Sequence, residues 1–210
     1  VSIESASDNL NDSIKNICGG GRGWSNRLGI VDITRTNVVL KSSENRDGHL
    51  AQNVFGGGYY SQVDSTWVYA ERGNFNNIFG ASYGSTANGL SVSYASNVTN
   101  IYTYENLQNN ALNIYGAGSY AGSSKTNITL YGGKAAFVYG GSFNEGYCDT
   151  TKVTIPAGST FSATAIYGGG KGSDSQLPCD VDQSIISFNS DDAHLEDAIY
   201  GGNRSERAVK

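Results

Sequence analysis

The stretch at residues 126–141 decides the fold of this 210-residue chain. It reads Thr-Asn-Ile-Thr-Leu-Tyr-Gly-Gly-Lys-Ala-Ala-Phe-Val-Tyr-Gly-Gly, which is an alternating run, a glycine pair, an apolar run and a second glycine pair. Its closing phrase is an aliphatic residue, usually an aromatic one, then glycine and a small residue. Seven copies begin at Ile17, Val54, Ile78, Ile114, Val138, Ile166 and Ile199. Self-similarity at a spacing of tens of residues is typical of a solenoid.

A second recurring element precedes the phrase and predicts a strand. These runs alternate in polarity and are rich in β-branched and aromatic residues. They cover residues 37–40, 66–69, 100–104, 127–130, 152–155 and 184–188. We therefore predict an all-β chain, a right-handed parallel β-helix of about six or seven coils, with residues 1–210 as one domain.

Stacked coils would align equivalent side chains into columns about 4.8 Å apart. We expect the aliphatic residue of each phrase to face the interior. The following column, from Cys18 to Tyr200, would face the other side of the strand and stack ring on ring. We interpret the glycine pair as a corner, because glycine adopts a positive φ at little cost.

Composition restricts the classes of partner. The chain carries 14 Lys and Arg against 19 Asp and Glu, a net charge of −5, and its cations are scattered along the sequence. The pattern therefore argues against a nucleic-acid partner. No run approaches the roughly 18 apolar residues of a membrane span. We expect no cofactor and no bound metal, and the acidic, glycine-rich composition favours a secreted or cell-surface protein.

The N-terminal residues are less regular than the rest. We predict that residues 1–16 form an N-terminal cap in which residues 5–16 are a short helix. The chain contains no Met, including at position 1, so we expect it to be a fragment of a longer protein.

The three cysteines suggest a cross-link between coils. Cys148 and Cys179 both follow a glycine corner, on successive coils. A disulfide requires Cα atoms about 4.4–6.8 Å apart, and stacked coils bring equivalent positions that close. We predict a Cys148–Cys179 bond and an oxidising compartment. Two free loop thiols are the alternative, and Cys18 is expected to be free and buried.

Phrases such as Thr-Asn-Ile-Thr-Leu-Tyr-Gly-Gly and Ala-Ile-Tyr-Gly-Gly-Gly resemble the tandem repeats of large bacterial surface proteins with right-handed parallel β-helix folds. The resemblance covers residues 16–203, except for irregular stretches at 21–32 and 82–100. It implies the same fold and an extracellular or cell-surface location. Proteins of that type are commonly adhesins, carbohydrate-binding modules or stalks.

Aromatic residues in the loops after the glycine corners are the best candidate for a binding site. They are Tyr59, Tyr60, Tyr83, Tyr120, Phe143 and Tyr147. Loops of a solenoid emerge on one side, and rigid amphipathic rings are common at binding surfaces. The alternative is that each ring only covers the edge of its own coil.

A catalytic interpretation is weaker. The segment 191–197 contains Asp191, Asp192, His194, Glu196 and Asp197, and paired carboxylates can serve in acid–base chemistry. The alternative for these residues is a solvated acidic loop. Asp174, Asp180 and Asp182 also lack the spacing of a calcium loop. We therefore expect a non-enzymatic protein that binds polysaccharide or a partner surface, with a carbohydrate-active enzyme or a structural spacer as alternatives, and an undetermined oligomeric state.

Overall fold

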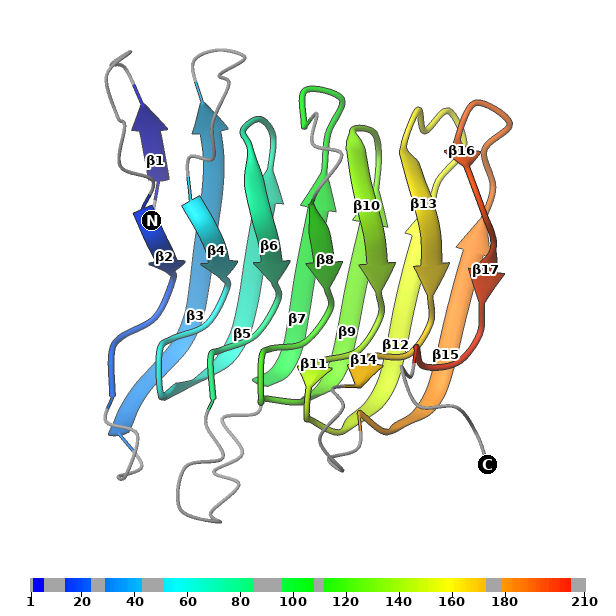
Figure 1. Cartoon of the computed structure of the whole chain (residues 1–210). Helices are drawn as coiled ribbons and strands as arrows, with labels where there is room; N and C mark the ends of the chain where they lie inside the picture. Colours follow the sequence, from blue (N-terminus) through cyan, green and yellow to red (C-terminus); the bar gives the residue numbers. More distant parts are fainter. Residues whose placement is uncertain are drawn as a thin grey trace.

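A computed structural model of the chain describes residues 2–5, 14–23, 29–42, 51–84, 96–107, 112–172 and 179–204. Within these residues the structure is all β, without a helix, and the strands pair in parallel (Figure 1). No described segment forms a helix that is long and apolar enough to cross a membrane.

Two long sheets make up most of the structure. Sheet A contains, in spatial order, β1 (Ser2–Ser5), β3 (Gly29–Ser42), β5 (Ser61–Ala70), β7 (Ser96–Thr103), β9 (Ser123–Leu130), β12 (Cys148–Ile155) and β15 (Val181–Phe188). Sheet B contains β2 (Ile14–Cys18), β4 (Ala51–Phe55), β6 (Phe75–Phe79), β8 (Asn113–Tyr115), β10 (Lys134–Tyr139), β13 (Ser162–Tyr167), and then β16 (His194–Leu195) and β17 (Ile199–Tyr200), which both pair with β13. A small third sheet pairs β11 (Phe143–Asn144) with β14 (Lys171–Gly172).

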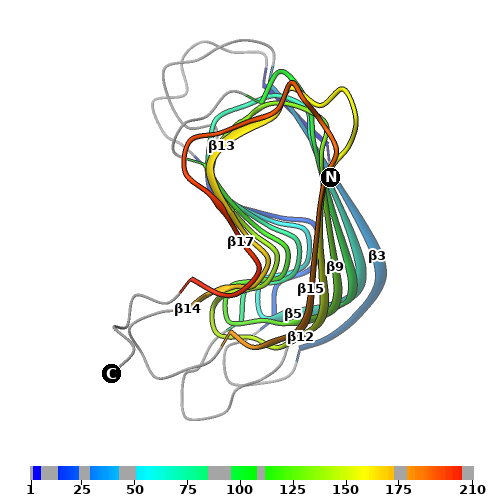
Figure 2. The same cartoon turned by 90° about the vertical axis from the view of Figure 1, so that its right-hand side faces the viewer.

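The chain alternates between the two sheets along its length (Figure 2). We call one strand of sheet A together with the sheet B strand or strands that follow it a repeat. The predicted strand runs all lie in sheet A, except that Tyr104 follows the end of β7. The glycine phrases lie at the ends of the sheet B strands, where the chain turns toward the next strand of sheet A.

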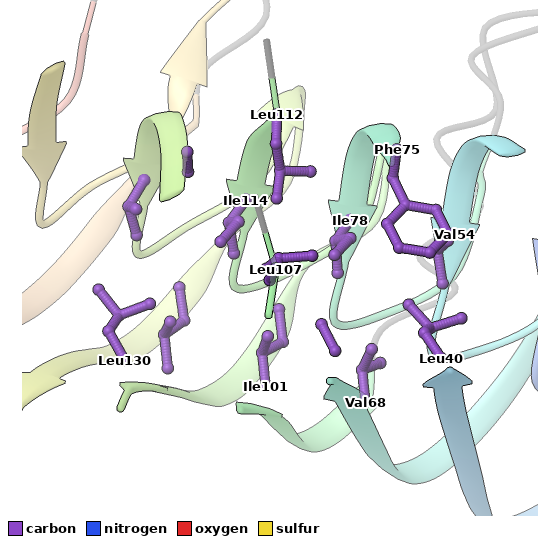
Figure 3. Packing of buried hydrophobic residues seen from close by; sticks show 14 of the residues in the cluster. Leu40, Val54, Val68, Phe75, Ile78, Ile101, Leu107, Leu112, Ile114 and Leu130 are labelled. Atoms are coloured by element: carbon purple, nitrogen blue, oxygen red, sulfur yellow. The ribbon is translucent and has the colours of Figure 1, made fainter. Parts of the chain in front are cut away.

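The main core lies between the sheets and is built from the predicted aliphatic column. Val54, Ile78, Ile114, Val138 and Ile166 are in register on neighbouring strands and fully buried. Side chains of sheet A such as Val68 and Ile101 pack in the same cluster (Figure 3). The prediction of an inward aliphatic column is confirmed, although its last member, Ile199, is 43% exposed.

The aromatic column forms a second cluster, separate from the aliphatic core. Its rings are stacked nearly parallel, with centroids 4.7 to 5.1 Å apart and interplanar angles of 6° to 12°, in the order Phe55, Phe79, Tyr115, Tyr139, Tyr167 and Tyr200. Each such pair contributes about 1 kcal/mol beyond the area it buries. The predicted stacking is confirmed.

The reason for the first glycine of the phrase differs from the prediction. Among the described glycines, those with positive φ are Gly73, Gly133, Gly146 and Gly158, and none belongs to a phrase. A Cβ atom on Gly116 would instead collide with the carbonyl oxygen of Gly140 in the next repeat. The first glycine is therefore required by the close approach of neighbouring backbones.

A row of buried threonines bonds to the same glycines. The side chains of Thr36, Thr66, Thr99, Thr126 and Thr151 are buried in sheet A. Each hydroxyl donates a hydrogen bond of 2.5 to 2.6 Å to the carbonyl oxygen of the first phrase glycine in its own repeat. These bonds join sheet A to sheet B inside each repeat from β3 and β4 to β12 and β13.

The predicted N-terminal helix is wrong where the structure describes it. Residue Ser5 ends strand β1, and Ile14 and Asn16 belong to strand β2. Asn16 accepts a 3.0 Å hydrogen bond from the Asn53 side chain, so ladder pairing with β4 determines the local conformation. Residues 6–13 lie outside the described part of the chain.

The structure also does not contain the predicted disulfide, since Cys18, Cys148 and Cys179 are all free. Cys148 lies opposite Val181, and its N–H donates to the Asp180 carbonyl oxygen, so Cys179 is two residues out of register. Burial raises the pKa of the Cys148 thiol to about 12 and that of Cys179 to about 11. Cys18 occupies the aromatic column as predicted, but it is half-buried.

Candidate functional site

The residues that follow the glycine corners align from repeat to repeat. Parallel pairing connects one residue of each corner into a continuous column. Its members are Arg22, Tyr59, Tyr83, Ser119, Phe143, Lys171 and Arg204. The next residues along the chain include Tyr60, Tyr120 and Asn144. We call these residues together the corner ridge.

Five of the six predicted site residues belong to the corner ridge. The rings of Tyr59 and Tyr83 are stacked with centroids 4.6 Å apart. Tyr60 lies edge-on to both, at 4.6 and 5.4 Å, and Tyr120 lies edge-on to Tyr83 at 6.4 Å. Phe143 lies further along the same column. The structure therefore brings side chains from separate loops onto one surface.

Tyr147 does not join them. It precedes strand β12, is 51% exposed, and its hydroxyl donates to a carboxylate oxygen of Asp182. That hydrogen bond, with the nearby negative charge, raises the pKa of Tyr147 to about 12. Tyr147 is thus an exposed ring apart from the corner ridge.

The ridge also packs against the aromatic column beneath it. Tyr83 is edge-on to Phe55 at 5.6 Å, and Phe143 contacts Tyr115 at 5.2 Å. Burial, together with neighbouring tyrosines, raises the pKa of Tyr83 to about 12. Tyr83 and Phe143 therefore do cover the edges of their repeats, which was the structural alternative for these residues.

Tyr60 and Tyr120 have an unusual backbone conformation. Their φ angles are 55° and 56°, in the left-handed region, and Asn144 at the equivalent position has a φ of 69°. A bulky side chain is rarely found there, whereas glycine and asparagine tolerate it. Along the stack, Gly84 lies between Tyr60 and Tyr120, and Gly172 lies next to Asn144; neither glycine has a positive φ. An aromatic ring is therefore present at two positions where the backbone favours a smaller residue.

Cations lie toward the C-terminal end of the ridge. The Lys171 ammonium group lies 5.4 Å from the centre of the Phe143 ring. The Arg204 guanidinium group lies 4.7 Å from the Phe137 ring and donates a 3.0 Å hydrogen bond to the Tyr139 hydroxyl. These contacts hold both cations against aromatic faces.

A second aromatic group escaped the sequence analysis. Trp67, Tyr69, Tyr102, Tyr104 and Tyr131 lie on or just beyond the strands of sheet A, with Tyr69 and Tyr102 stacked at 5.2 Å and Tyr104 and Tyr131 at 5.7 Å. The Arg35 guanidinium group lies 3.9 Å from the centre of the Trp67 ring. The sequence could have indicated this group, because most of these aromatic residues occupy outward positions of the predicted alternating strands.

The acidic segment 191–197 does not form a converging site. Asp191, Asp192, His194, Glu196 and Asp197 are exposed. Glu196 accepts a hydrogen bond from Thr164, and Asp197 accepts one from Tyr200. Among the described residues, no three His, Cys, Asp or Glu side chains are grouped to hold a metal ion, and Asp174 lies outside those residues.

Comparison with known proteins gives no relative from which a function could be transferred. No protein-family model, curated protein or solved structure matches this chain.

Proposed function

We propose that this chain is a right-handed parallel β-helix of about six or seven coils that binds a polysaccharide, or the surface of a partner, through the corner ridge and without catalysis. The alternation of the chain between two parallel sheets supports the fold. Crossovers between parallel strands are right-handed in nearly all proteins, which supports the hand. An extracellular or bacterial cell-surface location is part of the proposal.

The observation that carries the binding role is the strained backbone of Tyr60 and Tyr120. A non-glycine residue held in this region costs of the order of 1–3 kcal/mol. Gly84 and Gly172 occupy this position in other repeats without a positive φ, so the repeat itself needs neither a ring nor this backbone conformation there. The rings pack edge-on against neighbouring rings of the corner ridge, and we propose that they also make a contact outside the fold.

The spacing of the ridge suits an extended ligand. Successive corners follow the separation of neighbouring strands, which is about 4.8 Å. A chain-like ligand that lies along the stack would meet one corner after another. Individually weak contacts would then sum to a useful affinity.

The absence of catalysis is proposed because the candidate acid and base groups do not converge. Glycoside hydrolysis requires two carboxyl groups at a defined separation across one bond. The described carboxylates of the 191–197 segment are exposed, and two of them accept hydrogen bonds from Thr164 and Tyr200.

The test compares the double variant Tyr60→Asn/Tyr120→Asn with the matched control Tyr147→Asn. Asparagine is native at the equivalent corner position 144 and tolerates positive φ. A polysaccharide array identifies a ligand of the wild-type protein, and titration then gives Kd for each variant. The double variant should weaken binding about tenfold or more, which is about 1.4 kcal/mol. The control should bind like the wild type.

Stability separates a binding role from a packing role. Because the substitutions relieve backbone strain, the free energy of unfolding should stay the same or rise by about 1 kcal/mol. Undiminished binding by the double variant would overturn the corner ridge as the site. A loss of stability would favour the alternative that the rings cover the repeats. Release of reducing ends or unsaturated sugars by the wild-type protein would overturn the non-catalytic proposal.

A further inference from the structure

The central outward positions of sheet A carry a net positive charge, opposite in sign to that of the whole chain, while Asp64, Asp149 and Asp182 lie one residue before the first of these positions. Strand register arranges its central outward positions in three columns, which run from Arg35, Asn37 and Val39 in β3 to Gln183, Ile185 and Ser187 in β15. None of the three columns contains Asp or Glu. They do contain Arg35, Lys125 and Lys152, in a chain whose net charge is −5.

The three cations are accessible. Arg35, Lys125 and Lys152 are all exposed, and no described carboxylate forms an ion pair with any of them. The ion pair on this side of the molecule, Lys41–Glu71 at 3.1 Å, lies just beyond the three columns. No described segment is drawn over this side of sheet A, which faces right in Figure 2. The three cations are therefore open to a ligand.

Neutral hydrogen-bonding groups lie between the cations. Asn127 bonds to the Asn100 side chain at 3.2 Å, and Lys152 is the next residue of the same column. Thr129 and Thr154 are neighbours in the adjacent column. Amides and hydroxyls with intermittent positive charge suit a polymer that carries many hydroxyls and occasional anionic groups.

Aromatic rings of this face have at least one flat side occupied. Tyr69 and Tyr102 cover each other at 5.2 Å, and Arg35 covers Trp67. Single-stranded nucleic acids are bound by stacking each base on an open ring face. The arrangement therefore favours a sugar polymer over a nucleic acid.

We propose that the outer face of sheet A binds an acidic polysaccharide, with Lys125 and Lys152 contacting its anionic groups. This inference rests on the proposed function and names its ligand class. It adds a second surface to the corner ridge. Binding through these lysines is electrostatic and exposed, so it should weaken as salt is raised.

The experiment measures Kd of the wild-type chain for polygalacturonate and for chondroitin sulfate, with dextran as the neutral polysaccharide. The double variant Lys125→Gln/Lys152→Gln removes two charges from the face. Its matched control, Lys15→Gln/Lys134→Gln, removes the same charge from strands of sheet B. We expect at least one acidic probe to bind, the face variant to weaken it about tenfold, and the control to stay within about twofold.

Four outcomes would overturn this inference. They are no binding of either acidic probe, unchanged binding by the face variant, equal binding of dextran, and tighter binding of single-stranded oligodeoxythymidylate than of the polysaccharides. Failure of the proposed corner-ridge function can be distinguished from failure of the sheet A site. If a neutral array ligand still depends on Tyr60 and Tyr120, the corner ridge stands although the sheet A site has failed. If binding of an acidic probe depends on Lys125 and Lys152 but not on Tyr60 and Tyr120, the sheet A site stands although the corner ridge has failed.

Discussion

The phrase at residues 138–141 and the phrase at residues 199–202 are nearly the same sequence in different surroundings. Val138 and Tyr139 lie between neighbouring repeats and are fully buried, whereas Ile199 and Tyr200 in the last repeat are 43% and 41% exposed. A Cβ on Gly140 would collide with Gly168, while one on Gly201 would meet nothing within 4 Å. The contribution of a phrase to stability therefore depends on having a repeat on both sides, as expected of a solenoid.

The largest expected difference is in the aliphatic column. Ile114→Ala removes a fully buried side chain from the middle of the core and should lower the free energy of unfolding by about 4 kcal/mol. Ile199→Ala removes the same atoms from the exposed end and should cost about 1 kcal/mol or less. Denaturant unfolding of both variants checks this. Equal losses would mean that position in the stack does not matter.

The first glycine of the phrase gives a second matched pair. Gly116→Ala places a Cβ against the Gly140 carbonyl oxygen and should cost about 3 kcal/mol through overpacking. Gly201→Ala has free space and should stay within about 0.5 kcal/mol of the wild type. Thermal and denaturant unfolding measure both. A harmless Gly116→Ala would contradict the close approach of the backbones.

The threonine row supplies the smallest of the three differences. Thr126→Val keeps the shape of the side chain but leaves the buried Gly140 carbonyl without its hydroxyl donor, at a cost of about 1–3 kcal/mol. At the end of the row stands Ser184, whose buried hydroxyl has no partner among the described residues. Ser184→Ala should therefore be neutral to within about 0.5 kcal/mol, as judged from the same unfolding curves. A larger loss at Ser184 than at Thr126 would show that the row does not act as described.

The columns could be predicted from the sequence because the phrase marks the same place in each repeat. Aligning Val54 with Ile78 and Phe55 with Phe79 needs no knowledge of the loops between them. The reason for the glycines could not be predicted, since a backbone contact between repeats leaves the same residue in the sequence as a positive φ. Cys179 was misplaced because its register depends on the course of the loop before β15, which no motif specifies.

The candidate sites show the same limit. Tyr59, Tyr60, Tyr83, Tyr120 and Phe143 follow the glycine corner closely, so the phrase locates them. Tyr147 lies further along its loop, and its neighbour in space is Asp182. The charge of the sheet A face was not recognised because Arg35, Lys125 and Lys152 are far apart in sequence. Only strand register brings them onto one surface.

Amide hydrogen exchange of the wild-type chain tests most directly whether each repeat is stabilised by both neighbours. The N–H groups of Gly116 and Gly140 donate to Tyr139 and Tyr167 of the following repeats, in the buried middle of the stack. We predict that amides in residues 114–116 and 138–140 exchange about a hundredfold or more slowly than those in residues 199–202. Exchange at equal rates in the three phrases, or fastest in the middle of the stack, would contradict this account.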